Sequence, residues 1–135
     1  MEQKGVAYKE LDILCAESQI LSLHIAETPE TKSILSEKRI QSLPSGAIVV
    51  NTAPMELIDT KALAIRLAKK DITFLFDHTD ETGKEIMDMI TPYENCIPYP
   101  PIGYVTEEAR IAKQEIFLEN MRAFLDGKPV RTVIA

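Results

Sequence analysis

The sequence contains few of the residues that form several common kinds of site. Tryptophan is absent, and the 135 residues include only two cysteines, two histidines and five glycines. Cys15 and Cys96 are far apart, and His24 and His78 are not grouped with other metal ligands. We therefore expect no metal site. We also expect two reduced, buried thiols in a cytoplasmic protein.

Long apolar runs and an excess of positive charge are missing as well. No apolar run reaches the roughly 18 residues of a membrane-spanning helix, and the opening "MEQKGVAYKE" is too polar for a signal peptide. The 21 acidic residues outnumber the 15 Lys and Arg, which gives a formal net charge of −6. Acidic chains bind the phosphate backbone poorly. We therefore expect neither a membrane nor a nucleic acid as a partner.

The length and composition are those of one globular domain over residues 1–135, with 45% apolar and 27% charged residues. Four short apolar runs predict strands: Ile20–Ile25, Ala47–Thr52, Ile72–Phe76 and Cys96–Tyr99. The first three are almost continuously apolar. That pattern is typical of parallel strands that are covered on both faces.

Helical patterns lie between these runs. Predicted helix starts are Thr28 followed by Pro29, Ser36, Asp59 and Thr106, because each offers an N-cap side chain. Leu11, Leu14 and Cys15 recur at helical spacing before the first strand, and the last helix is expected to end near Leu125, before Gly127. The alternation predicts an α/β fold with a parallel sheet of about four strands and flanking helices.

Five segments match, in order, a known pattern: "LDILCAESQILSLHIAETPET", "LPSGAIVVNTAPMELID", "KKDITFLFDHTDE", "CIPYPPIGYVTEEAR" and "NMRAFLDGKPVRTVIA". Together they resemble the second half of the NAD-binding domain of the D-isomer-specific 2-hydroxyacid dehydrogenases, such as phosphoglycerate and glycerate dehydrogenases. The resemblance implies a partial Rossmann-like sheet. The Gly-rich first half, whose G-x-G-x-x-G turn holds the pyrophosphate, has no counterpart here.

The positions that carry the family's chemistry have changed. Pro54 stands at the position of the substrate-binding arginine, and Pro101 at that of the proton-transferring histidine. Thr82 stands near the position of the glutamate that supports this histidine, although a shifted alignment would bring Asp80 or Glu81 there. Proline has neither a charge to clamp a carboxylate nor a proton to exchange.

Other matching positions are intact. The resemblance implies that Thr52, Ala53 and Asp77 line the nicotinamide side of the cofactor cleft and that His24 supports the loop beside the adenine; each also has a purely structural interpretation. Asn51 and Thr31 match as well. His78, at the end of the third predicted strand, is the other histidine considered for a chemical role. NAD is thus the implied cofactor, with weak or absent binding to this chain.

Three hypotheses follow. The first is a truncated or degenerate 2-hydroxyacid dehydrogenase without turnover of its own. The second is an oxidoreductase subunit completed by a partner chain that bears the Gly-rich half. The third is a non-enzymatic interaction module. We also expect a homo-oligomer, because Ile20–Ile25 becomes an uncharged edge strand when its neighbour is missing. The segment Gln3–Glu10 is the alternative cover for this edge.

Overall fold

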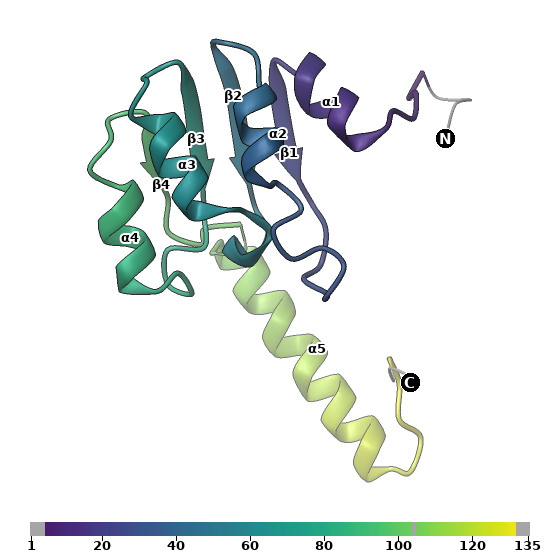
Figure 1. Cartoon of the computed structure of the whole chain (residues 1–135). Helices are drawn as coiled ribbons and strands as arrows, with labels where there is room; N and C mark the ends of the chain where they lie inside the picture. Colours follow the sequence, from purple (N-terminus) through teal and green to yellow (C-terminus); the bar gives the residue numbers. More distant parts are fainter. Residues whose placement is uncertain (1–4, 104, 132–135) are drawn as a thin grey trace. The chain divides into compact units, whose positions relative to one another are not determined.

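The computed structural model describes residues 5–103 and 105–131 (Figure 1). The chain divides into two compact units, residues 1–100 and 101–135, whereas the sequence predicts one domain over the whole length. Each unit is described separately below. No helix in the described ranges is long and apolar enough to cross a membrane.

The first unit contains a four-stranded sheet. Its strands are β1 (Ile20–Leu23), β2 (Ala47–Asn51), β3 (Ile72–Phe76) and β4 (Cys96–Pro98), in the spatial order β1-β2-β3-β4. Every neighbouring pair is parallel, with Leu21 beside Val49 and Val49 beside Phe74. The predicted parallel α/β fold is therefore confirmed, and each predicted strand is present to within one or two residues of its ends.

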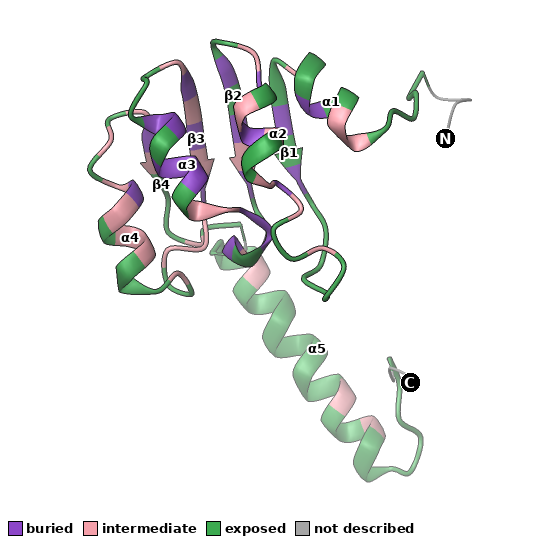
Figure 2. Ribbon diagram, viewed as in Figure 1, coloured by how far each residue is buried: buried purple, intermediate pink, exposed green. Residues whose placement is uncertain are grey.

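Four helices cover one face of this sheet. They are α1 (Leu11–Glu17), α2 (Glu37–Ser42), α3 (Thr60–Leu67) and α4 (Lys84–Ile90), and Figure 1 shows them side by side in front of the strands. A short 3-10 helix, η2 (Met55–Leu57), precedes α3. The core lies between the two layers and includes Ile40, Leu63 and Ile90 from the helices (Figure 2). Both thiols, Cys15 and Cys96, are free and buried.

The expectation that the strands are covered on both faces is wrong for this unit. Burial alternates along β1, β2 and β3, so Leu21 is buried while Ile20 is 68% exposed, and Val49 is buried while Ile48 is 37% exposed. The strand order explains this result. When successive parallel strands are added in one direction with crossovers of one hand, every crossover helix falls on the same face.

Two of the predicted N-caps are formed by side chains. The Asp59 carboxylate accepts a hydrogen bond from the Ala62 amide at 3.0 Å, and the Thr106 hydroxyl accepts one from the Ala109 amide at 3.1 Å. Ser36 stands at the N-cap of α2 but makes no such bond. These contacts satisfy backbone donors that the first helical turn leaves free.

The helix predicted to start at Thr28 is absent. Residues 29–33 form turns, because the Thr31 hydroxyl accepts a bond from the Thr28 amide at 2.7 Å and donates one to the Ala26 carbonyl at 2.8 Å. Ser33 then adopts a left-handed conformation with φ of 52°. The chain is thereby directed into a bridge between Leu35 and Ile58 instead of a helix.

The helix α4 is not among the sequence predictions. Its N-cap is Gly83, which has no side chain to signal a start. The spacing of Ile86 and Ile90, which pack on the core, is the signal that identifies it.

The second unit consists mainly of α5 (Glu107–Leu125). The helix ends as predicted: Gly127 takes a φ of +70°, and the Lys128 amide donates to the Ala123 carbonyl at 2.8 Å. None of the residues of α5 is buried.

Candidate functional site

The carboxyl ends of β1 and β2 are joined by a chain of hydrogen bonds through Thr52. The Thr52 hydroxyl lies 3.0 Å from His24 Nδ1 and 3.3 Å from the Leu23 carbonyl oxygen. His24 Nε2 lies 2.7 Å from the Ser22 hydroxyl. Both ring nitrogens of His24 are therefore engaged by neighbouring hydroxyls. The structure thus brings His24 and Thr52 together, as two positions of one cluster at this edge of the sheet.

The residues on either side of Thr52, Asn51 and Ala53, are buried and are joined by a hydrogen bond. Asn51 is fully buried, accepts a hydrogen bond from the Ala53 amide at 3.2 Å and places its Nδ2 3.5 Å from Met55 Sδ. Ala53 is only 4% exposed. Its methyl group therefore packs in the core, and any contact of Ala53 with a cofactor would come from its backbone.

Asp77 and His78 follow β3. His78 Nε2 lies 3.3 Å from the Thr52 carbonyl oxygen and 3.6 Å from Asp77 Oδ1, while Nδ1 lies 3.5 Å from Glu81 Oε2. Because a carbonyl oxygen only accepts, the contact with Thr52 requires the proton on Nε2. Asp77 Oδ1 is shielded from water and has no hydrogen-bond partner among the described residues. It is an acceptor available to a donor such as a carboxamide.

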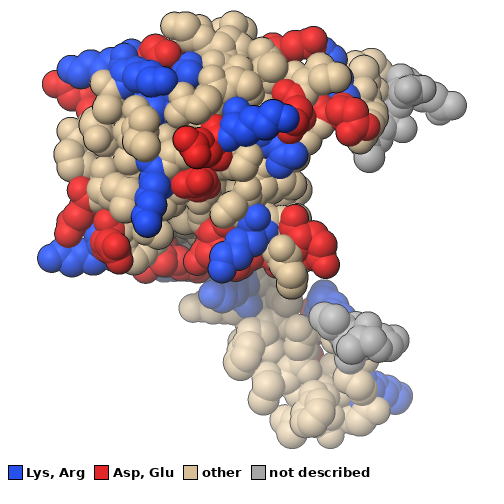
Figure 3. Space-filling view, viewed as in Figure 1, with Lys and Arg blue, Asp and Glu red and all other residues tan. Residues whose placement is uncertain are grey.

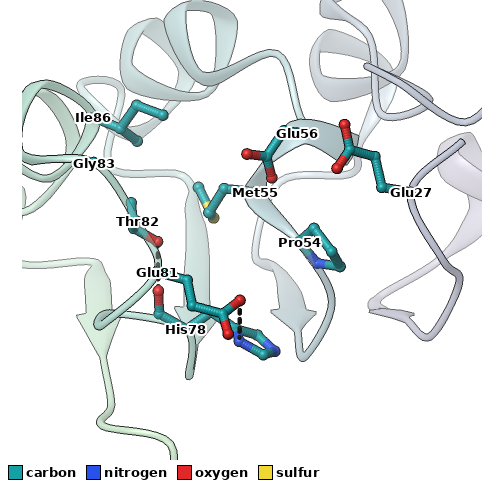
Figure 4. A pocket seen from close by; sticks show the side chains of 9 residues that line it. All are labelled: Glu27, Pro54, Met55, Glu56, His78, Glu81, Thr82, Gly83 and Ile86. Carbon is teal, nitrogen blue, oxygen red and sulfur yellow. Dashed lines mark hydrogen bonds and ion pairs between the residues drawn. The ribbon is translucent and has the colours of Figure 1, made fainter. Parts of the chain in front are cut away.

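A cavity of about 180 Å³ opens beside this cluster (Figure 4). Its walls come from the segments that follow β1, β2 and β3, and they consist of Glu27, Pro54, Met55, Glu56, His78, Glu81, Thr82, Gly83 and Ile86. This is the edge of a parallel sheet at which ligands bind in open α/β folds.

The residues that stand at the family's catalytic positions do not form a catalytic group in this chain. Pro54 is the N-cap of η2 and lines the cavity without a charge. The Thr82 hydroxyl donates to the His78 carbonyl oxygen at 2.6 Å, so it caps a turn and does not reach the ring. Pro101 is the first residue of the second unit. The carboxylate that does approach His78 is Glu81.

The cavity is acidic. Three of its lining residues are glutamates, and none is a lysine or arginine. In Figure 4 Glu27 and Glu56 lie to one side of Pro54, and Glu81 lies with His78 to the other. Over the visible face of the first unit, acidic and basic side chains are interspersed (Figure 3). Like charges repel, so this lining disfavours the carboxylate of a 2-hydroxy or 2-oxo acid.

Glu27, Glu56 and Met55 are not among the sequence-predicted site residues. Each lies within a few positions of the carboxyl end of a strand, and this proximity is the signal that identifies them. The described residues contain no group of three or more His, Cys, Asp or Glu that could hold a metal ion.

The residues present fit only one end of NAD. Asp77 Oδ1, which makes no hydrogen bond and lies 3.6 Å from His78 Nε2, is an acceptor of the kind that the carboxamide of a nicotinamide requires. The pyrophosphate requires closely spaced glycines at a strand-to-helix turn, and the five glycines at 5, 46, 83, 103 and 127 form no such group. The chain therefore fits the nicotinamide end and does not fit the pyrophosphate.

Comparison with known proteins places this sheet in a family. Residues 1–103 match the model of the D-isomer specific 2-hydroxyacid dehydrogenase, NAD binding domain. The glyoxylate reductase of Aeropyrum pernix is 30% identical over 128 residues, which cover 94% of this chain and 38% of the relative. The D-3-phosphoglycerate dehydrogenase of Methanocaldococcus jannaschii is 31% identical over 127 residues, 93% of this chain and 24% of the relative.

Solved structures agree. The apo D-lactate dehydrogenase of Escherichia coli superposes with a TM-score of 0.83 at 25% identity, over 96% of this chain and 41% of that one. The D-lactate dehydrogenase of Aquifex aeolicus, solved with NAD and lactic acid, gives 0.80 at 26% identity, over 94% of this chain and 43% of that one. The chain thus spans well under half the length of each of these four relatives. It belongs to the D-isomer specific 2-hydroxyacid dehydrogenase family, in the part that forms the NAD-binding domain.

Proposed function

We propose that this chain is a degenerate member of its family: it carries the nicotinamide-side half of an NAD-binding domain and does not itself turn over 2-hydroxy acids. One observation carries the proposal. The positions of the family's substrate-binding arginine and proton-transferring histidine are occupied by Pro54 and Pro101. The carboxylate clamp and the proton donor are therefore both removed.

The cavity supports the same conclusion. Its glutamates repel an anionic substrate, and no lysine or arginine lines it. The buried free thiols are consistent with a reducing compartment such as the cytoplasm.

A second candidate function is that of a subunit completed by a partner chain with the Gly-rich half. Two observations favour it. β1 lies at the edge of the sheet, and the described residues 5–10 form no strand beside it. His78 lies 3.5 Å from Glu81 at the cavity, and a histidine supported by a carboxylate is the arrangement that proton transfer uses. Native mass analysis distinguishes the two, because the subunit requires a stoichiometric partner of different mass.

A steady-state absorbance assay tests the main proposal. The purified chain at high concentration is offered a panel of 2-oxo acids with NADH or NADPH, and 2-hydroxy acids with NAD or NADP. We expect no turnover above that of a His78→Ala variant, since loss of such groups lowers rates by several orders of magnitude. Cofactor-dependent turnover that survives further purification and disappears in His78→Ala would contradict the proposal and support the second candidate.

A further inference from the structure

Two hydrogen-bond acceptors lie beside each other where β2 and β3 end. Asn51 and Phe76 are partners in the parallel register, and Thr52 and Asp77 follow them directly. The carbonyl oxygen of Thr52 can only accept a hydrogen bond. Asp77 Oδ1 is shielded from water and has no hydrogen-bond partner in the part of the chain that the structure describes. A buried acceptor without a donor is costly, so this position favours any group that brings one.

One side-chain donor approaches both acceptors. His78 Nε2 lies 3.3 Å from the Thr52 carbonyl oxygen and 3.6 Å from Asp77 Oδ1. The first distance is that of a long hydrogen bond, and the second is too long for one. A ring nitrogen carries only one proton, so the imidazole serves Thr52 and leaves Asp77 without a donor.

The loop that follows β3 holds the ring in this place. The carbonyl oxygen of His78 accepts hydrogen bonds from the Thr82 amide at 3.0 Å and from the Thr82 hydroxyl at 2.6 Å. Glu81 Oε2 lies 3.5 Å from the other ring nitrogen, Nδ1 (Figure 4). The side chain of His78 is only 28% exposed and lines the cavity. The imidazole is therefore part of the cavity wall.

We propose that His78 is a displaceable blocking residue, whose imidazole takes the place of a ligand's primary carboxamide beside Thr52 and Asp77. The inference rests on the proposed function, because it assigns this carboxamide to the nicotinamide end of NAD. The NH₂ group of a carboxamide has two N–H donors and can serve both acceptors at once, which the imidazole cannot do. The ligand thereby gains a hydrogen bond to Asp77 that the free chain lacks.

The block weakens binding without abolishing it. A ligand binds only when the ring is displaced, so its affinity is reduced by the fraction of molecules in which the ring has moved away from Thr52. The contact with the Thr52 carbonyl is a single hydrogen bond. One such bond changes an equilibrium constant by about five- to tenfold.

Titration of the whole chain with nicotinamide, followed by NMR chemical shifts, measures the block. We expect His78→Ala to bind nicotinamide about five- to tenfold more tightly than the unchanged chain, since it lacks the competing hydrogen bond. His78→Gln is the matched control. Its side-chain amide keeps an N–H donor, so it is expected to bind as weakly as the unchanged chain. Combining Asp77→Ala with His78→Ala is expected to remove the gain.

Nicotinate is the control ligand. It carries a carboxylate in place of the carboxamide, so it cannot donate to Thr52 or Asp77 and is repelled by the acidic lining. The inference is overturned by no gain in His78→Ala, by an equal gain in His78→Gln, or by a gain that extends to nicotinate or survives Asp77→Ala. The turnover assay judges the proposed function separately, because it measures the conversion of 2-oxo and 2-hydroxy acids and not the binding of nicotinamide.

A measurement on the unchanged chain tests the same contact if His78→Ala does not fold, which circular dichroism shows. The hydrogen bond to the Thr52 carbonyl requires a proton on Nε2 of His78. We expect ¹⁵N NMR of the imidazole to show this proton on Nε2, and nicotinamide to shift the His78 ring signals as it displaces the ring. A ring protonated on Nδ1 alone, or His78 signals that do not respond to bound nicotinamide, would contradict the inference.

Discussion

Cys96 illustrates how burial alone changes the chemistry of a side chain. It lies at the start of β4, only 6% exposed. Removal from water penalises the thiolate and raises the pKa of the thiol to about 11. Burial also raises the pKa of the Cys15 thiol. Neither cysteine is therefore a nucleophile at neutral pH.

The reactivity of Cys96 can be measured in a Cys15→Ala variant. At pH 8 a thiol with a pKa of about 11 is roughly one part in a thousand thiolate. We therefore expect labelling by a disulfide reagent to be about 100-fold slower or more in the folded protein than in denaturant, and to accelerate about tenfold per pH unit up to pH 10. Equal rates in the folded and unfolded protein would contradict this.

The same shift in pKa affects stability. The unfolded chain, with a thiol pKa near 8.5, loses its proton before the folded chain does. The contribution of Cys96 is thus fully present below about pH 8.5 and is lost as the pH rises towards 11.

At the scale of residues, the sequence predicted the candidate site only in part. The resemblance pointed to Pro54, Thr82 and Asp77 through its motifs, and the structure places Pro54 and Thr82 in the lining of the cavity and Asp77 directly after β3. The acidic lining was not predicted, because Glu27 and Glu56 come from different loops and their proximity depends on how the loops fold. The placement of Thr31 in a turn depends on its own hydrogen bonds, which a helical pattern does not reveal.

At the scale of elements, Asp59 and Ser36 form a natural pair for measuring an N-cap. Asp59 accepts a hydrogen bond from the Ala62 amide, whereas Ser36 occupies the same position before α2 without a side-chain bond. We expect Asp59→Ala to lower the free energy of unfolding by about 1 kcal/mol. The control, Ser36→Ala, is expected to lower it by no more than a few tenths of a kcal/mol.

Urea unfolding followed by circular dichroism gives both values. If Asp59→Ala lowers the free energy of unfolding no more than Ser36→Ala does, the hydrogen bond from the Ala62 amide to Asp59 does not stabilise the protein, and the prediction is wrong.

The strands could be predicted better than their surroundings. Apolar runs located all four strands, because a core strand must be apolar whatever covers it. The same runs wrongly predicted cover on both faces, because Ile20 and Ile48 are apolar and yet exposed. The helix α4 was missed since a seven-residue helix with a glycine at its N-cap has little local signal.

At the scale of the whole molecule, the chain matches its relatives along nearly all of its own length and along less than half of theirs. In our proposal the matching part offers Asp77 to the nicotinamide end of NAD, and its sequence contains no glycine-rich turn for the pyrophosphate. In a Rossmann fold the pyrophosphate rests on such a turn and on a helix N-terminus. We therefore expect the chain to bind NAD weakly or not at all.

Titration calorimetry of the 135-residue chain with NAD tests this account most directly. The control is the D-lactate dehydrogenase of Aquifex aeolicus, which was solved with NAD. We expect no heat of binding, or a dissociation constant no better than about 1 mM, equivalent to about −4 kcal/mol. A micromolar dissociation constant that weakens on Asp77→Ala would contradict the account, because it would mean that this half of the domain holds the cofactor without a pyrophosphate turn.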